Sequence, residues 1–192
     1  MYKYYDNKLK REINNLGPGE YLSSDEDIVI NTVLGSCVSV VLFDPILKAG
    51  GFNHFMLADV SLNTRIDNFF KVERYGLYAM ESLINDFLKR GSKKSNLKAK
   101  VFGGSRMLET QRVIDIGAEN IRFAEEFLKT EKIPIISQDT GGSKAMKIYL
   151  YTKTFRILLK RVDSRTTELY QQMEAYKKKL KEEKDGGIIV LF

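Results

Sequence analysis

The sequence predicts an α+β fold, a single domain of mixed β-sheets with two to three amphipathic helices packed outside. Three observations support this prediction. The chain has 192 residues, of which 43% are hydrophobic, which is enough for one sizeable core and too few for two comfortable domains. Short apolar runs rich in Val, Ile and Leu end at Gly, Pro or Asp, as strands do. Longer stretches repeat apolar residues every three or four positions, which is typical of helices with one buried face.

The first predicted strands follow a polar N-terminus. We expect residues 1–15 to form a flexible tail, because chain ends are poorly ordered unless something holds them. Residues 28–43 are rich in Val, Ile and Leu and are interrupted only at 34–36, so they predict two strands that meet at a tight bend. Asp44-Pro45 then predicts a turn.

A third short strand is predicted over 52–57, after Gly50-Gly51 restarts the chain. Alternation along this strand places His54 on one face with the apolar residues two positions away. We therefore expect His54 to face inward beside Cys37, which begins the second strand of the preceding pair.

Helical periodicity predicts two helices in the middle of the chain. The first covers 72–88 and ends before Gly91, a residue suited to a helix C-cap. The second covers 117–132 and has Asn120 in its first turn, where the side chain could bond its own backbone or contact a substrate. Further strands are predicted over 97–102, 133–137, 145–151 and 155–162, the last two as a hairpin.

The C-terminal region predicts a third helix over 165–184, which is polar apart from a narrow apolar stripe. Its last turns carry more lysine than glutamate, which suits the negative end of the helix dipole. This face is either solvated or docks on an acidic partner. The apolar tail 188–192 requires burial, as an edge strand or in a partner.

Composition narrows the classes of function. The formal net charge is +6, which favours an acidic partner without requiring nucleic acid, and the aromatic residues follow no RNA-binding pattern. Charges occupy the N-terminus where a secretory signal would be apolar, and no segment approaches a membrane span. We expect a cytoplasmic protein that neither inserts into membranes nor binds nucleic acid.

Cys37 is the only cysteine and His54 the only histidine. With a single cysteine, the chain cannot form an internal disulfide. With only one cysteine and one histidine, a zinc site built by the protein is implausible, so we expect no metal and no cofactor. A cysteine and a histidine in turn-flanked apolar segments fit a cysteine hydrolase, because a thiol needs a base to become nucleophilic at neutral pH. A buried structural cysteine and histidine are the alternative.

The sequence around these two residues resembles a known family. The blocks 18–21, 30–40, 51–57, 100–108, 116–120, 139–142 and 186–192 resemble, in order, the signature of the CheD chemoreceptor glutamine deamidases. The resemblance covers residues 16–192, including the helix 165–184 and the tail 188–192. It implies a single deamidase domain with layered sheets, a CheD-like cysteine hydrolase sandwich.

The resemblance also implies an activity and its residues. The activity is that of a protein-glutamine glutaminase, an amidohydrolase that converts glutamine to glutamate through a Cys37 thioester, with receptor methylesterase activity as a second outcome. His54 would be the base. Thr32 matches the family's third residue, although neighbouring Asn31 could also orient an imidazole. Apart from the resemblance, Gly35 and the small Ser36 would let the backbone turn sharply, so that main-chain donors near Cys37 could form an oxyanion hole.

The implied partners are the cytoplasmic helical bundle of chemoreceptors and a CheC-type phosphatase. The same resemblance permits a different class of function, a chemotaxis adaptor that binds receptors or the phosphatase without catalysis.

Overall fold

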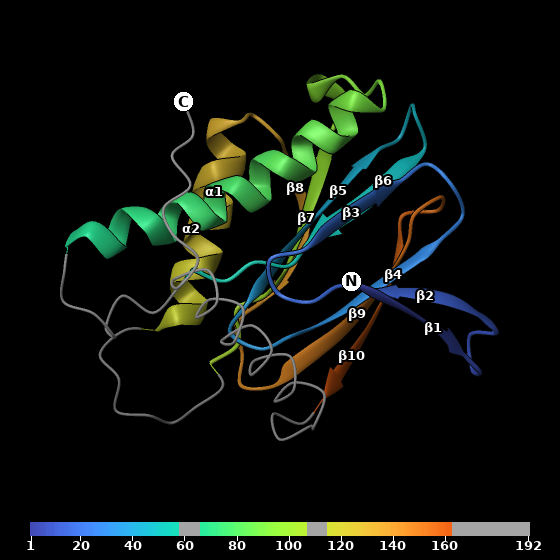
Figure 1. Ribbon diagram of the computed structural model, residues 1–192, viewed down its shortest axis with the longest axis horizontal. Coiled ribbons are helices and arrows are strands. Elements are labelled where there is room, and N and C mark those ends of the chain that lie inside the picture. Colours follow the sequence, from blue (N-terminus) through green and yellow to red (C-terminus); the bar gives the residue numbers. More distant parts are fainter. Residues whose placement is uncertain (58–65, 107–114, 163–192) are drawn as a thin grey trace.

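Two five-stranded mixed sheets form the body of the protein in the computed structural model, which describes residues 1–57, 66–106 and 115–162 (Figure 1). The first sheet has the order β1 (Tyr2–Asp6), β2 (Arg11–Asn15), β4 (Val29–Leu34), β9 (Ala145–Tyr151), β10 (Arg156–Val162). The second has the order β3 (Tyr21–Ser24), β6 (Ala49–Asn53), β5 (Val38–Asp44), β7 (Lys98–Gly103), β8 (Ile135–Thr140). The helices are α1 (Ile66–Lys89) and α2 (Ile116–Thr130), with a short 3-10 turn at Lys94–Asn96. The α+β prediction is confirmed.

The second sheet lies between the two helices and the first sheet (Figure 1). Alternation along β5 explains this arrangement, because successive side chains of a strand point to opposite faces. Val38, Val40 and Leu42 pack in one core with the buried faces of α1 and α2. Val41 packs in a second core, between the sheets, with Ile148 of β9. Because β5 is buried on both faces, its sequence is a nearly continuous apolar run rather than an alternating pattern.

Both helices end or begin as local chemistry predicts. Gly91 follows α1 with φ +95, and Ser92 N–H bonds Phe87 O at 3.1 Å, the pattern of a glycine C-cap. The helix predicted over 72–88 is therefore the later part of α1. At α2, the Asp115 side chain accepts from Ala118 N–H at 3.1 Å as an N-cap.

The N-terminal residues are not the flexible tail that we expected. β1 pairs antiparallel with β2, and β2 pairs parallel with β4, so residues 2–15 extend the first sheet. Ile13 is completely buried in this position. Pairing with a strand distant in the sequence, rather than local propensity, orders this segment.

The strand predicted over 52–57 is displaced toward the N-terminus in the structure. β6 spans Ala49–Asn53, so the glycine pair lies inside the strand instead of before it. A Cβ atom on Gly51 would lie 2.5 Å from Ser23 Cα, so glycine is required for β3 to pair at this point. His54 follows the end of β6, and Phe55 forms only an isolated bridge with Val38.

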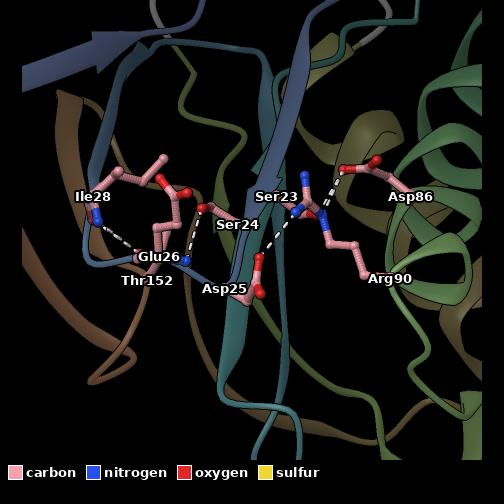
Figure 2. Close-up of polar contacts among 8 residues, drawn as sticks. All are labelled: Ser23, Ser24, Asp25, Glu26, Ile28, Asp86, Arg90 and Thr152. Carbon is pink, nitrogen blue, oxygen red and sulfur yellow. Dashed lines mark hydrogen bonds and ion pairs between the residues drawn. The ribbon is translucent and has the colours of Figure 1, made fainter.

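Polar contacts hold the edge strand β3 and the chain that leaves it (Figure 2). Ser23 Oγ donates to Asp86 at 2.6 Å and accepts from Arg90 Nε at 3.0 Å, which joins β3 to the end of α1. Farther on, Ile28 N–H donates to Thr152 Oγ1 at 3.1 Å. The connection from β3 to β4 is therefore fixed to α1 at one end and to the first sheet at the other.

No helix in the described parts of the chain is long and apolar enough to cross a membrane. The predicted helix 165–184 and the tail 188–192 lie outside the described residues.

Candidate active site

Cys37 and His54 are brought to one face of the second sheet by a single backbone bridge. Val38 and Phe55 exchange two hydrogen bonds of 2.9 Å, so their chain segments run antiparallel. In this register Cys37 and His54 are diagonal neighbours on the same face, with backbones about 7 to 8 Å apart. Cys37 belongs to the core between the sheets. The two side chains therefore lie on the same face, although no hydrogen bond joins Cys37 to His54 Nε2 in the described residues.

Thr32 comes from the opposite sheet and contacts the imidazole. Its Oγ1 lies 2.7 Å from His54 Nδ1 and donates its proton to Leu16 O, also at 2.7 Å. Since a hydroxyl has one proton, Thr32 must accept from Nδ1–H. His54 Nε2 is then an unprotonated acceptor, and this buried atom has no hydrogen-bond partner in residues 1–57, 66–106 and 115–162.

Asn31, the alternative to Thr32, does not reach the imidazole. It is the next residue on β4 and therefore points to the other face of the first sheet. Both polar atoms of its side chain are buried, and neither has a partner among the residues that the structure describes. Of the two candidates, the structure brings only Thr32 together with His54.

Burial keeps the thiol and the imidazole neutral at rest. Cys37 is 8% exposed and His54 1% exposed. Burial raises the pKa of Cys37 from 9.0 to about 12, although the backbone N–H of the same residue partly offsets the rise. Burial lowers the pKa of His54 from 6.5 to about 4, against the opposing effects of the Leu16 backbone and the charge of Glu20. The resting pair is therefore a thiol and a neutral base rather than an ion pair.

Three successive carbonyl groups fix the turn that carries the cysteine, which we call the Cys37 turn (residues 35–37). Two of them accept a hydrogen bond from the residues that follow β7, and the middle one accepts from α2. The pairs are Ser105 N–H to Gly35 O at 2.8 Å, Asn120 Nδ2 to Ser36 O at 2.8 Å, and Gly104 N–H to Cys37 O at 2.7 Å. The turn is therefore held along its whole length by a neighbouring segment.

Gly103 allows this close approach. Its φ is +103, and a Cβ atom there would lie 2.2 Å from Cys37 O. Gly104 follows and donates its N–H to Cys37 O, so the glycine pair contacts the backbone of the Cys37 turn.

Asn120 lies next to the predicted site residues and does not bond the backbone of its own helix, as one of the two predictions had it. Its Nδ2 donates to Ser36 O at 2.8 Å, and its Oδ1 accepts from Leu57 N–H at 2.7 Å. The sequence does contain a signal. Asn120 occupies the buried stripe of α2 with Gly117, Ala124 and Leu128, where an apolar residue is normal.

Within the described residues, no group of three or more His, Cys, Asp or Glu side chains could hold a metal ion. The polar groups that converge here are one thiol, one imidazole, one hydroxyl and the backbone of the Cys37 turn.

Comparison with known proteins identifies the family. The model for "CheD chemotactic sensory transduction" matches residues 56–161, which is more than half of the chain. The chain belongs to the CheD family. It is 38% identical over 190 residues to a probable chemoreceptor glutamine deamidase CheD of Methylobacillus flagellatus, covering 98% of this chain and 94% of that protein.

Two further CheD relatives are similar over the same length. A probable chemoreceptor glutamine deamidase CheD 1 of Shewanella oneidensis is 37% identical over 99% of this chain and 92% of its own. A probable chemoreceptor glutamine deamidase CheD of Herminiimonas arsenicoxydans is 39% identical over 98% of this chain and 93% of its own. The matched stretches extend over nearly the whole chain, whereas the family model begins after Cys37 and His54. The resemblance stated from the sequence is confirmed.

Proposed function

We propose that this CheD protein is a protein-glutamine deamidase that converts glutamine side chains of chemoreceptors to glutamate through a thioester on Cys37. The observation that carries the proposal is the contact between Thr32 and His54 Nδ1, which leaves Nε2 as a base on the face that also carries Cys37. The names of the full-length relatives support the substrate, because each is a probable chemoreceptor glutamine deamidase.

The first half of the reaction forms the thioester. Cys37 Sγ attacks the carboxamide carbon of glutamine while its proton passes to His54 Nε2, and the carbonyl electron pair moves to oxygen. When the oxygen pair returns, the carbon–nitrogen bond breaks. The nitrogen takes the proton from Nε2 and leaves as ammonia.

The second half releases glutamate. Water gives a proton to His54 Nε2 and attacks the thioester carbon, and the sulfur then leaves and recovers that proton. Throughout, Thr32 accepts from Nδ1–H and holds the ring in the tautomer that the chemistry requires. Because the resting pair is neutral, we place the proton transfer in the same step as sulfur attack.

Backbone N–H groups of the Cys37 turn are our candidates for the oxyanion hole. Gly35 and the small Ser36 permit the sharp bend between β4 and β5. The Cys37 N–H lies close enough to its own sulfur to lower the pKa of the thiol, and Ser36 N–H donates to no backbone carbonyl of the described chain. Donors beside the attacking atom are suited to stabilise the developing negative oxygen.

The finer assignments follow from the family and the shared chemistry. A glutamate methyl ester would form the same acyl intermediate with methanol as leaving group, so we include receptor methylesterase activity. We also propose the receptor's cytoplasmic helical bundle as the docking partner, a CheC-type phosphatase as a second partner, and the cytoplasm as the location.

The test is deamidation of a purified receptor cytoplasmic fragment by the wild type and by Cys37→Ala. We expect the wild type to release ammonia and to raise the substrate mass by about one dalton per glutamine, with no backbone cleavage. Cys37→Ala should bind the fragment and release no ammonia. Equal ammonia release by both proteins would exclude the thiol mechanism. Binding without any release by the wild type would favour the adaptor function instead.

A further inference from the structure

We propose that Asn120 is a positioning residue of this site, whose one amide group fixes the Cys37 turn and the segment that carries His54 relative to each other. The inference rests on the proposed deamidase function and adds a residue to it. Asn120 does not contact the reacting atoms and acts through the backbone of its neighbours.

The geometry of the amide is unambiguous. Asn120 is completely buried, its Nδ2 donates to Ser36 O at 2.8 Å, and its Oδ1 accepts from Leu57 N–H at 2.7 Å. One partner is an acceptor and the other is a donor, so only one orientation of the amide satisfies both. Ser36 directly precedes Cys37, and Leu57 follows His54 by three residues. A single side chain therefore ties the two catalytic segments to α2.

The contact with Ser36 O determines where an adjacent donor points. All peptide bonds described are trans, and in a planar trans peptide the C=O and the following N–H point in opposite directions. Holding Ser36 O toward Asn120 therefore directs Cys37 N–H away from α2. This is the N–H that lies beside Cys37 Sγ. Asn120 thus orients the donor that we assign to the oxyanion hole.

Docking of α2 does not by itself require an amide here. Ala124 and Leu128 of the same helix face are buried in the core shared with β5, and Asp115 caps the helix. An apolar residue at position 120 would continue that face, whereas a buried amide is costly unless its hydrogen bonds are made. The two bonds to Ser36 and Leu57 account for the presence of asparagine.

Asn120→Asp tests the proposal with the least change in shape. The new carboxyl can still accept from Leu57 N–H, but it can donate to Ser36 O only while protonated. We expect kcat for deamidation to fall about 10²- to 10³-fold, the usual effect of losing one oxyanion donor, with a smaller change in KM. The loss should deepen as pH rises and the carboxyl ionises. Asn120→Ala, which adds no charge, should show a loss that does not depend on pH.

A second readout separates positioning from general damage. Alkylation of Cys37 by iodoacetamide forms no oxyanion, so in Asn120→Ala, which adds no charge near the thiol, its rate should fall far less than kcat does. Thr152→Val is the matched control, because it removes a buried side-chain contact to the backbone at Ile28, toward the other end of β4 (Figure 2). Its kcat per folded molecule should equal that of the wild type, with folded fractions taken from urea unfolding.

Three outcomes would overturn the inference: wild-type kcat in both Asn120 variants, an equal loss of alkylation and deamidation, or an equal loss of kcat in Thr152→Val. The proposed function fails separately. If the wild type releases no ammonia from the receptor fragment, both the deamidase function and the role of Asn120 are rejected. If release requires Cys37 but is unchanged in the Asn120 variants, only the role of Asn120 is rejected.

Discussion

The buried histidine makes the free energy of unfolding depend on pH, and a substitution of His54 separates its contribution from that of other groups. Burial lowers the pKa of His54 from 6.5 to about 4 in the folded chain. Between these two values the unfolded chain binds a proton that the folded chain does not. The free energy of unfolding that His54 contributes is therefore fully present above pH 6.5 and is lost as the pH falls toward 4.

The size of the effect follows from the two pKa values. Proton linkage with a shift from 6.5 to about 4 gives a loss of about 2 kcal/mol by pH 5 and about 3 kcal/mol by pH 4, relative to pH 8. Other groups also titrate in this range, but the chain has only one histidine. A variant that lacks it therefore reports the other groups alone.

The assay is urea unfolding of the wild type and His54→Asn at pH 8, 6, 5 and 4. Asparagine keeps an N–H that can donate to Thr32, which limits unrelated damage. We expect the wild type to lose about 2 kcal/mol more than His54→Asn between pH 8 and 5. Parallel pH profiles for the two proteins would refute the reasoning, because they would show that His54 titrates alike in the folded and unfolded chain.

The remaining predictions concern three other residues of the site. Thr32→Val should lower the free energy of unfolding by about 2 to 4 kcal/mol, because it leaves Leu16 O and His54 Nδ1–H unpaired. Its kcat should fall about 10²-fold or more, whereas Thr32→Ser should keep most of the stability and most of the activity. Gly103→Ala should lose at least about 2 kcal/mol because its Cβ would meet Cys37 O at 2.2 Å, while Gly141→Ala, with positive φ but nothing within 4 Å, should lose about 1 kcal/mol. Alkylation of Cys37 should rise with pH beyond pH 10 without a plateau, since burial raises the thiol pKa to about 12, and urea-unfolded protein should reach its plateau earlier.

Local signals were enough to predict most elements. The strand predicted over 145–151 is β9, and the helix end before Gly91 is the end of α1. Apolar periodicity and glycine caps depend on neighbours within a few residues, so they are visible in the sequence. The N-terminal strands were missed because what orders them is parallel pairing of β2 with β4, a contact between segments that only the fold brings together.

The sequence was enough to predict which residue types form the site, but not which of them contact one another. Cys37 and His54 could be paired because strand alternation put both on inward faces. The choice between Thr32 and Asn31 required knowing which face of β4 meets the second sheet, and the sequence 28–43 is apolar on both faces. For Asn120, the sequence shows only a polar residue in the apolar stripe of α2. Its partners are backbone atoms of two loops, which no pattern of side-chain types could reveal.

Burial of the nucleophile also bears on the kind of substrate that can react. Cys37 has 8% of its surface exposed, and its neighbours in the core between the sheets include Leu34 and Phe102. A main-chain carbonyl would have to bring its flanking residues to this sulfur, whereas a glutamine carboxamide stands at the end of a flexible side chain. The narrow access therefore favours side-chain hydrolysis over peptide cleavage. An entering side chain would also exclude water from the site, where His54 Nε2 is the unpartnered acceptor that the thiol proton needs.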